Sequence, residues 1–276
     1  MVQAAEELQQ IFGAPDHRID LGRAALVIAQ LQHPGLDIQH YIDKLGLFAS
    51  EASSRLQGRY DPERVIEQLN HFLFVDLAFR GNEEDYYDPR NSFLSDVIDR
   101  RTGIPITLAV IYLEVSRRLG LPFYGVGLPG HFVLKYDDNR QAILIDPFHG
   151  GRILQFEQCR ELIARRGDPA SLEPLDLRAV DNRYIIIRML NNLRGIYLRT
   201  RQFREAVGIL DMTVSLTPSS ARDIKQRAWL HHELRQYGRA CRDLEAYLSL
   251  GSPDDPEREG IQGWIREIYE KIASMN

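Results

Sequence analysis

The sequence predicts an α+β domain followed by an all-α domain. Apolar residues recur at helical spacing through about the first 90 residues, three short apolar segments separated by turn residues occupy positions 123–145, and a self-similar helical pattern begins near residue 184. We therefore expect a helical N-terminal portion with a small antiparallel sheet in residues 1–166, a linker at 167–183, and a helical-repeat domain at 184–276.

The composition is that of an ordinary globular protein, with 44% hydrophobic and 26% charged residues. A formal charge of −5 gives no reason to expect a nucleic-acid or anionic-membrane partner. The N-terminus lacks the pattern of a signal peptide, and no apolar run approaches the roughly 18 residues that span a bilayer. Cys159 and Cys241 lie far apart and form no metal-binding motif. We expect a cytoplasmic protein with free thiols, no membrane contact and no cofactor.

Capping residues divide the N-terminal region into short helices. Asp20 precedes an apolar periodic stretch that ends at 33–35, Asp37 precedes the next, and Asp61 is followed by Pro62 at a first helical position. The segment 80–89 carries the polar and turn residues of a surface loop.

A buried helix and a small sheet follow. The helix is expected at 105–119, with one apolar stripe and Gly120 just beyond its end. Strands are expected at 123–126, 131–136 and 141–145, and a further helix at about 156–165.

The C-terminal pattern fits a 34-residue tetratricopeptide repeat. With Pro218 at position 32, the expected packing positions repeat as Phe203/Tyr237, Ala206/Ala240 and Leu210/Leu244, whereas Arg227 and His231 depart from the pattern. A helix near 261–268 is expected to cap two repeats, because each repeat buries only one face against its neighbour.

His131 and Asp146 lie on two strands of the predicted hairpin. If Asp138 and Asn139 are the centre of the turn, His131 faces Asp146 directly, near enough for the carboxylate to accept a hydrogen bond from the imidazole. Such a pair is either part of a catalytic arrangement or a half-buried histidine satisfied by a neighbouring carboxylate.

Four segments of the chain carry a resemblance to a known family: Asp85–Ser92, Arg100–Thr107, Gly127–Phe132 and Ile145–Gly151. The region resembles the transglutaminase-like superfamily, in particular the bacterial SirB-related group, in which such a domain precedes tetratricopeptide repeats. The resemblance implies a transglutaminase/papain-like core in which His131 and Asp146 match the catalytic His and Asp. The catalytic Cys of active members falls about fifteen residues before a Gly-Leu-Pro, and this position is Pro105.

Proline supplies no nucleophile, although its fixed φ suits the first turn of a helix. Thr107 is expected to point away from position 105, and Ser92 and Ser95 approach the pair only if the preceding segment folds that way. His149 is expected in a surface loop. Alternatively, it lines the same cleft as His131 and Asp146. A metal bound by His131, Asp146 and His149 is a more elaborate account than an inward-facing dyad, so we expect no metal.

Six of the residues expected to line the concave face of the repeats are candidate peptide-binding residues: Arg188, Asn191, Arg199, Arg222, Lys225 and Trp229. Their basic groups suit a protein or peptide partner that presents a carboxylate or an acidic segment. Alternatively, this face folds back on the first domain or is merely solvated.

The sequence thus favours a catalytically inactive transglutaminase-like domain that acts with the repeats as a protein- or peptide-binding scaffold or regulatory protein. The alternative is an amide hydrolase or acyltransferase that uses His131 and Asp146 with a displaced nucleophile or an activated water. A purely structural role, with the cleft filled by its own side chains, is the third hypothesis.

Overall fold

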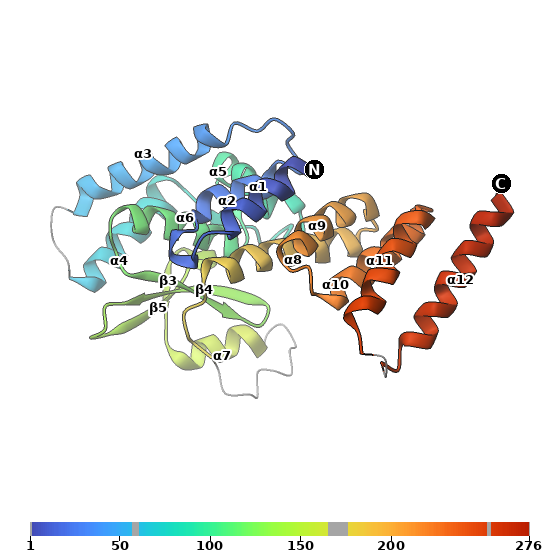
Figure 1. The fold of residues 1–276 in the computed structure, drawn as a ribbon. Coiled ribbons are helices and arrows are strands. Elements are labelled where there is room, and N and C mark those ends of the chain that lie inside the picture. Colours follow the sequence, from blue (N-terminus) through green and yellow to red (C-terminus); the bar gives the residue numbers. More distant parts are fainter. Residues whose placement is uncertain (1, 57–60, 165–175, 253–254, 276) are drawn as a thin grey trace. The chain divides into compact units, whose positions relative to one another are not determined.

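The computed structural model describes residues 2–56, 61–164, 176–252 and 255–275, and the chain divides into two compact units (Figure 1). One unit comprises residues 11–189 and the other residues 1–10 with 190–276. The division differs from the expected boundaries, because the first ten residues group with the repeats and the second boundary falls inside helix α8 (Asn182–Arg199). Most of the expected linker lies outside the described residues.

Short helices form the N-terminal part of the chain: α1 (Val2–Phe12), α2 (Leu21–Ala29), α3 (Ile38–Leu56), α4 (Pro62–Asn70) and α5 (Leu94–Arg100). The predicted caps are confirmed. The carboxylates of Asp20, Asp37 and Asp61 accept hydrogen bonds from backbone N–H groups three residues further along, at 2.9, 3.1 and 3.3 Å. No helix among the described residues is both long and apolar enough to cross a membrane.

Helix α6 (Pro105–Arg118) is the centre of the first unit. It was expected to bury one stripe, but every residue from Pro105 to Ser116 is buried. The reason is that α6 packs against the sheet through β3 and β4 while α2, α3 and α5 also pack against it. Gly120, at φ 68°, ends the helix as predicted.

The main sheet is antiparallel with strand order β3 (Phe123–Leu128), β4 (His131–Asp137), β5 (Ala142–Asp146) and β6 (Arg152–Leu154). The predicted hairpin register is wrong by two residues, because Leu134 pairs with Ile145 rather than with Ile143. The turn is longer than expected: the Asp138 carboxylate accepts from the backbone N–H groups of Arg140 and Gln141, both at 3.0 Å. A shift of two residues keeps each side chain on its face, so His131 and Asp146 still share one face.

The segment expected as a surface loop begins with a short strand. Strand β1 (Arg80–Gly81) pairs in parallel with β2 (Thr102–Gly103), just before α6. Further along, the buried carboxylate of Asp88 forms ion pairs with Arg90 at 2.9 Å and Arg100 at 3.3 Å. This segment is therefore tied to the start of α6.

Helix α7 (Phe156–Ala164) packs against the sheet in a core that includes Val126, Val133 and Cys159. Burial raises the pKa of the Cys159 thiol to about 11, and the nearby charge of Asp146 is a smaller contribution in the same direction. This thiol is therefore protonated at neutral pH and unsuited to act as a nucleophile.

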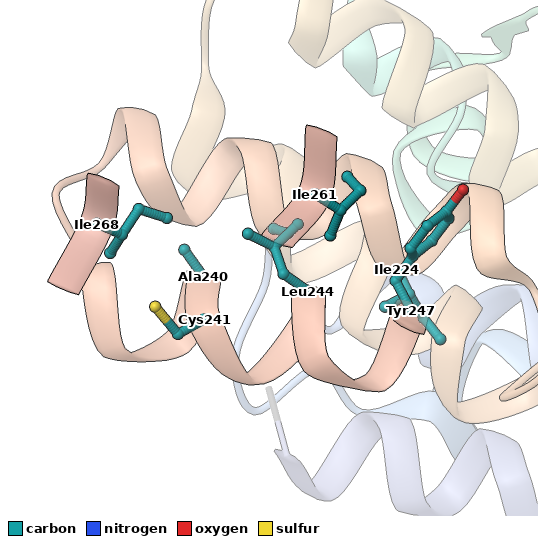
Figure 2. Close-up of a cluster of buried hydrophobic side chains, with 8 residues drawn as sticks. Ile224, Ala240, Cys241, Leu244, Tyr247, Ile261 and Ile268 are labelled. Atoms are coloured by element: carbon teal, nitrogen blue, oxygen red, sulfur yellow. The ribbon is translucent and has the colours of Figure 1, made fainter. Parts of the chain in front are cut away.

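The second unit contains the predicted repeat helices: the C-terminal part of α8, then α9 (Phe203–Leu216), α10 (Ala221–Glu233), α11 (Tyr237–Leu250) and the capping helix α12 (Arg258–Met275). Arg201 and Arg235, 34 residues apart, both adopt left-handed backbone conformations at φ 56° and 57°. The buried cluster between α10, α11 and α12 is drawn in Figure 2 and contains Ile224, Ala228, Ala240, Cys241, Leu244, Tyr247, Ile261 and Ile268. Within this unit α9, α10, α11 and α12 pack in succession, each against the next.

Candidate functional site

His131 begins β4 and Asp146 ends β5, which brings the two side chains together inside the first unit. Nε2 of His131 lies 3.0 Å from Oδ1 of Asp146. Both residues are almost fully buried, at 3% and 1% exposure. The same carboxylate oxygen accepts a hydrogen bond from the backbone N–H of Phe148 at 3.0 Å.

Asp146 is held as a carboxylate by its neighbours. Burial alone favours the protonated form, but the hydrogen bond and charge of His131, and then those of His149, outweigh it and lower the pKa of Asp146. The site therefore holds a negative charge in a buried position, next to two imidazoles.

His149 joins this cluster through the second carboxylate oxygen. Its Nδ1 lies 2.6 Å from Oδ2 of Asp146, and its ring stacks on the His131 ring at a centroid distance of 6.1 Å. On the other side of the ring, Nε2 lies 3.8 Å from Oε1 of Glu83. The side chain is exposed, as expected for a loop histidine, yet it belongs to the cleft cluster. Sequence reasoning missed this arrangement because the spacing Asp146–His149 shows its meaning only once the 3-10 turn η4 (Pro147–His149) forms.

The start of α6 carries no free nucleophile. Pro105 is buried at the first helical position, and η4 packs against both α6 and β1. The Thr107 hydroxyl bonds to Asn91 O at 2.8 Å and accepts from the Ile104 N–H at 3.1 Å.

The hydroxyls of Ser92 and Ser95 are buried and have no hydrogen-bond partner among the described residues. Within the described chain no Ser, Thr or Cys side chain is hydrogen-bonded to His131. The direct opposition of Pro105 and His131 stays a prediction.

Arg188 lies in the first unit, on the first turns of α8. Its guanidinium donates to the carbonyl oxygen of His131 at 2.7 Å and to that of Leu128. It also lies 3.1 Å from the Tyr184 hydroxyl. Arg188 therefore fixes the backbone at the start of β4, and it belongs to a different unit from the predicted peptide-binding residues of the second repeat.

Arg222, Lys225 and Trp229 line one groove of about 580 Å³ in the second unit. Tyr247, Glu257 and Trp264 line it too, and sequence reasoning missed them because they come from α11, the segment after it and α12, respectively. Trp229 is 39% exposed, which leaves part of its ring open to solvent. Asn191 and Arg199 are exposed on α8 and do not line this groove.

Lys225 is the charged centre of the groove. Its Nζ lies 2.7 Å from both carboxylate oxygens of Glu257, and the same carboxylate accepts from the Tyr247 hydroxyl at 2.6 Å. Arg222 is exposed and forms no ion pair within the described residues. The groove thus combines an unpaired cation, a surface ion pair and aromatic rings.

The two residues that departed from the repeat pattern have a structural role. Arg227 bonds to both carboxylate oxygens of Asp243, at 2.9 and 2.7 Å, and to Asp211 at 2.9 Å. His231 Nδ1 lies 2.8 Å from Gln236 Oε1. These contacts replace apolar packing with a polar network between neighbouring helices.

Comparisons with known proteins agree with the division of the chain. Residues 39–191 match the family model described as the transglutaminase-like superfamily, and residues 193–265 match a tetratricopeptide repeat model. The chain is 34% identical over 240 residues to a UPF0162 protein of Xylella fastidiosa strain Temecula1, covering 85% of each chain. It is 27% identical over 251 residues to a UPF0162 protein of Vibrio cholerae, covering 91% of this chain and 93% of that one.

A eukaryotic relative shares part of the chain. F-box only protein 21 of Homo sapiens is 28% identical over 211 residues, which are 72% of this chain and 32% of that protein. No solved structure gives a significant match.

Proposed function

We propose that this chain, which belongs to the transglutaminase-like superfamily and carries tetratricopeptide repeats, is a peptide-binding scaffold whose first domain is catalytically silent. Tetratricopeptide repeats generally mediate protein–protein interaction, and their presence supports a binding role for this chain. The observation that carries the specific form of the proposal is the groove lined by Arg222, Lys225 and Trp229.

Two features support catalytic silence. Pro105 stands at the sequence position of the nucleophile, and no hydroxyl or thiol among the described residues is hydrogen-bonded to His131. Loss of one member of a catalytic triad costs several orders of magnitude in rate. The retained His131–Asp146 pair is then a framework without its attacking group.

The chemistry of the groove favours a ligand with a carboxylate next to an apolar side chain. Arg222 offers five N–H donors in a planar fork, the geometry that binds a carboxylate with two hydrogen bonds. Lys225 is a second cation in the same groove. It is already paired with Glu257, so a ligand carboxylate competes with Glu257 for it. Trp229 and Trp264 supply flat apolar surfaces for the neighbouring ligand side chain.

The chain offers a direct optical readout, because its two tryptophans both line this groove. We expect a library of short peptides with acidic residues or free C-terminal carboxylates to contain sequences that change tryptophan fluorescence saturably. Amidated, acid-free analogues of these peptides are expected to bind at least about tenfold more weakly, since charge-assisted hydrogen bonds contribute roughly 1.5–3 kcal/mol each.

The double substitution Arg222→Ala and Lys225→Ala is expected to weaken binding of the selected peptides by at least about tenfold. Arg239→Ala is the matched control, since Arg239 is an exposed arginine of the same unit that does not line the groove. Equal affinity of the double variant and the wild type, or the absence of any saturable peptide, would refute the proposed function.

A further inference from the structure

The cluster of His131, Asp146 and His149 has a chemistry that the scaffold does not use. One donor atom from each side chain lies within 4.8 Å of the donor atoms of the other two. Each carboxylate oxygen of Asp146 faces a different imidazole, at 3.0 Å and 2.6 Å. Two neutral nitrogen donors and one carboxylate on convergent side chains are ligands that suit divalent transition-metal ions.

Hydrogen bonds alone hold this cluster when each imidazole donates one N–H to Asp146, and a cation can take the place of these protons. A neutral imidazole carries one N–H. When the His149 proton is on Nε2, which faces Glu83 at 3.8 Å, the Nδ1 lone pair points at Asp146 Oδ2 from 2.6 Å. Two electron-rich atoms at that distance repel each other unless a proton or a cation lies between them.

We propose that His131 Nε2, His149 Nδ1 and a carboxylate oxygen of Asp146 bind one divalent transition-metal ion of the zinc class. At zinc–ligand distances of about 2.0–2.1 Å in tetrahedral geometry, neighbouring ligand atoms are roughly 3.3 Å apart. With Oδ1 of Asp146 as the ligand, its distance of 3.0 Å to His131 Nε2 widens by about 0.3 Å when the ion enters, and with Oδ2 its distance of 2.6 Å to His149 Nδ1 widens by about 0.7 Å. Three protein ligands leave a fourth position for water or a ligand atom.

Groups around the cluster hold the ligands in place. Oε1 of Glu83 lies 3.8 Å from Nε2 of His149, the nitrogen that carries the ring proton when Nδ1 binds a metal. The Phe148 N–H donates to Asp146, and Arg188 donates to the carbonyl oxygen of His131. Outer contacts of this kind orient metal ligands, and removing one typically weakens metal binding about 10–100-fold.

The ligands come from the start of β4, the end of β5 and the end of η4. The ion would therefore join the two sides of the hairpin at one end of the sheet. This inference goes beyond the proposed function and runs against the sequence-based expectation of no metal. Its readout is also separate from peptide binding, which the tryptophans of the other unit report.

The test is metal titration of the full-length chain after chelator treatment, with Zn²⁺ measured by equilibrium dialysis and Co²⁺ by visible absorption. We expect one ion per chain and the absorption of four-coordinate Co²⁺. Glu83→Gln, which keeps the shape of an exposed side chain, is expected to weaken Zn²⁺ binding by no more than about fivefold, because exposed ion pairs contribute little. His149→Ala is expected to abolish saturable binding, and thermal unfolding of both variants checks that they fold.

His17→Ala is the control, because His17 is exposed and lies outside the cluster. It is expected to bind Zn²⁺ as the wild type does. No saturable binding of Zn²⁺ or Co²⁺ by the wild type would overturn the proposal and leave a purely hydrogen-bonded cluster. Binding that His149→Ala leaves unchanged would overturn it too, because the ion would then be bound elsewhere.

Discussion

Pro105→Cys is expected to create a thiol whose alkylation by iodoacetamide has its pH midpoint about 2 units below the value of roughly 8.5 for a free cysteine. The position is the first residue of α6, where the helix dipole favours a thiolate, and the sequence resemblance places it opposite His131. A shift of this size raises the thiolate fraction at pH 6 about 100-fold. A thiolate of lower pKa is a weaker nucleophile, which lowers its rate of alkylation nearly tenfold. The net gain in alkylation rate at pH 6 is therefore about tenfold.

The comparison variant combines Pro105→Cys with His131→Ala, and a chelator keeps metal from the histidine. We expect the combined variant to return most of the way to the ordinary midpoint. Wild-type protein provides the background, because Cys159 and Cys241 are both buried and burial raises the pKa of each thiol. An ordinary midpoint in both variants would show that residue 105 does not face the imidazole.

Arg227→Ala is expected to lower the free energy of unfolding of the repeat unit by about 3 kcal/mol, because breaking a buried ion pair leaves an uncompensated charge. The substitution strands Asp243, which is only 7% exposed, and removes the partner of Asp211. Chemical denaturation followed by tryptophan fluorescence reports on this unit, since Trp229 and Trp264 both belong to it.

Lys225→Ala is the matched control for this experiment, because Lys225 belongs to the same unit as the tryptophans. Lys225 lies 2.7 Å from both carboxylate oxygens of Glu257, but the two side chains are 36% and 53% exposed. Exposed pairs contribute little, so we expect no measurable change in stability. Equal effects of the two substitutions would show that burial is not what makes the Arg227 network matter.

The elements that the sequence predicted well are those set by local rules. Capping aspartates mark the starts of the N-terminal helices, and Gly120 marks the end of α6. The 34-residue period predicts the repeat helices, because each repeat meets its neighbour through the same positions. The left-handed residues Arg201 and Arg235 show that even the turns follow this period.

The features that the sequence did not predict depend on contacts between distant segments. The hairpin register depended on whether Asp138 closes a longer turn, and hydrophobic alternation is the same for both registers. Strands β1, β2 and β6 are too short to show a periodic pattern. Arg188 was assigned by its repeat position, but the first turns of α8 pack in the other unit.

The candidate sites show the same limit. The predicted hairpin paired His131 with Asp146, and the resemblance matched them to the catalytic His and Asp, whereas His149 joined them only through the geometry of η4. Tyr247, Glu257 and Trp264 complete the groove from parts of the chain outside α10. No spacing in the sequence singles out His149 as part of the cluster, or these three residues as part of the groove.

Amide turnover by the purified wild-type chain tests the central claim of catalytic silence most directly. Ammonia release from peptide amides and glutamine side chains is measured beside His131→Ala, with the protein as isolated. Catalytic silence predicts no turnover above the buffer blank and no difference between the two proteins. Turnover by the wild type that His131→Ala abolishes would contradict it.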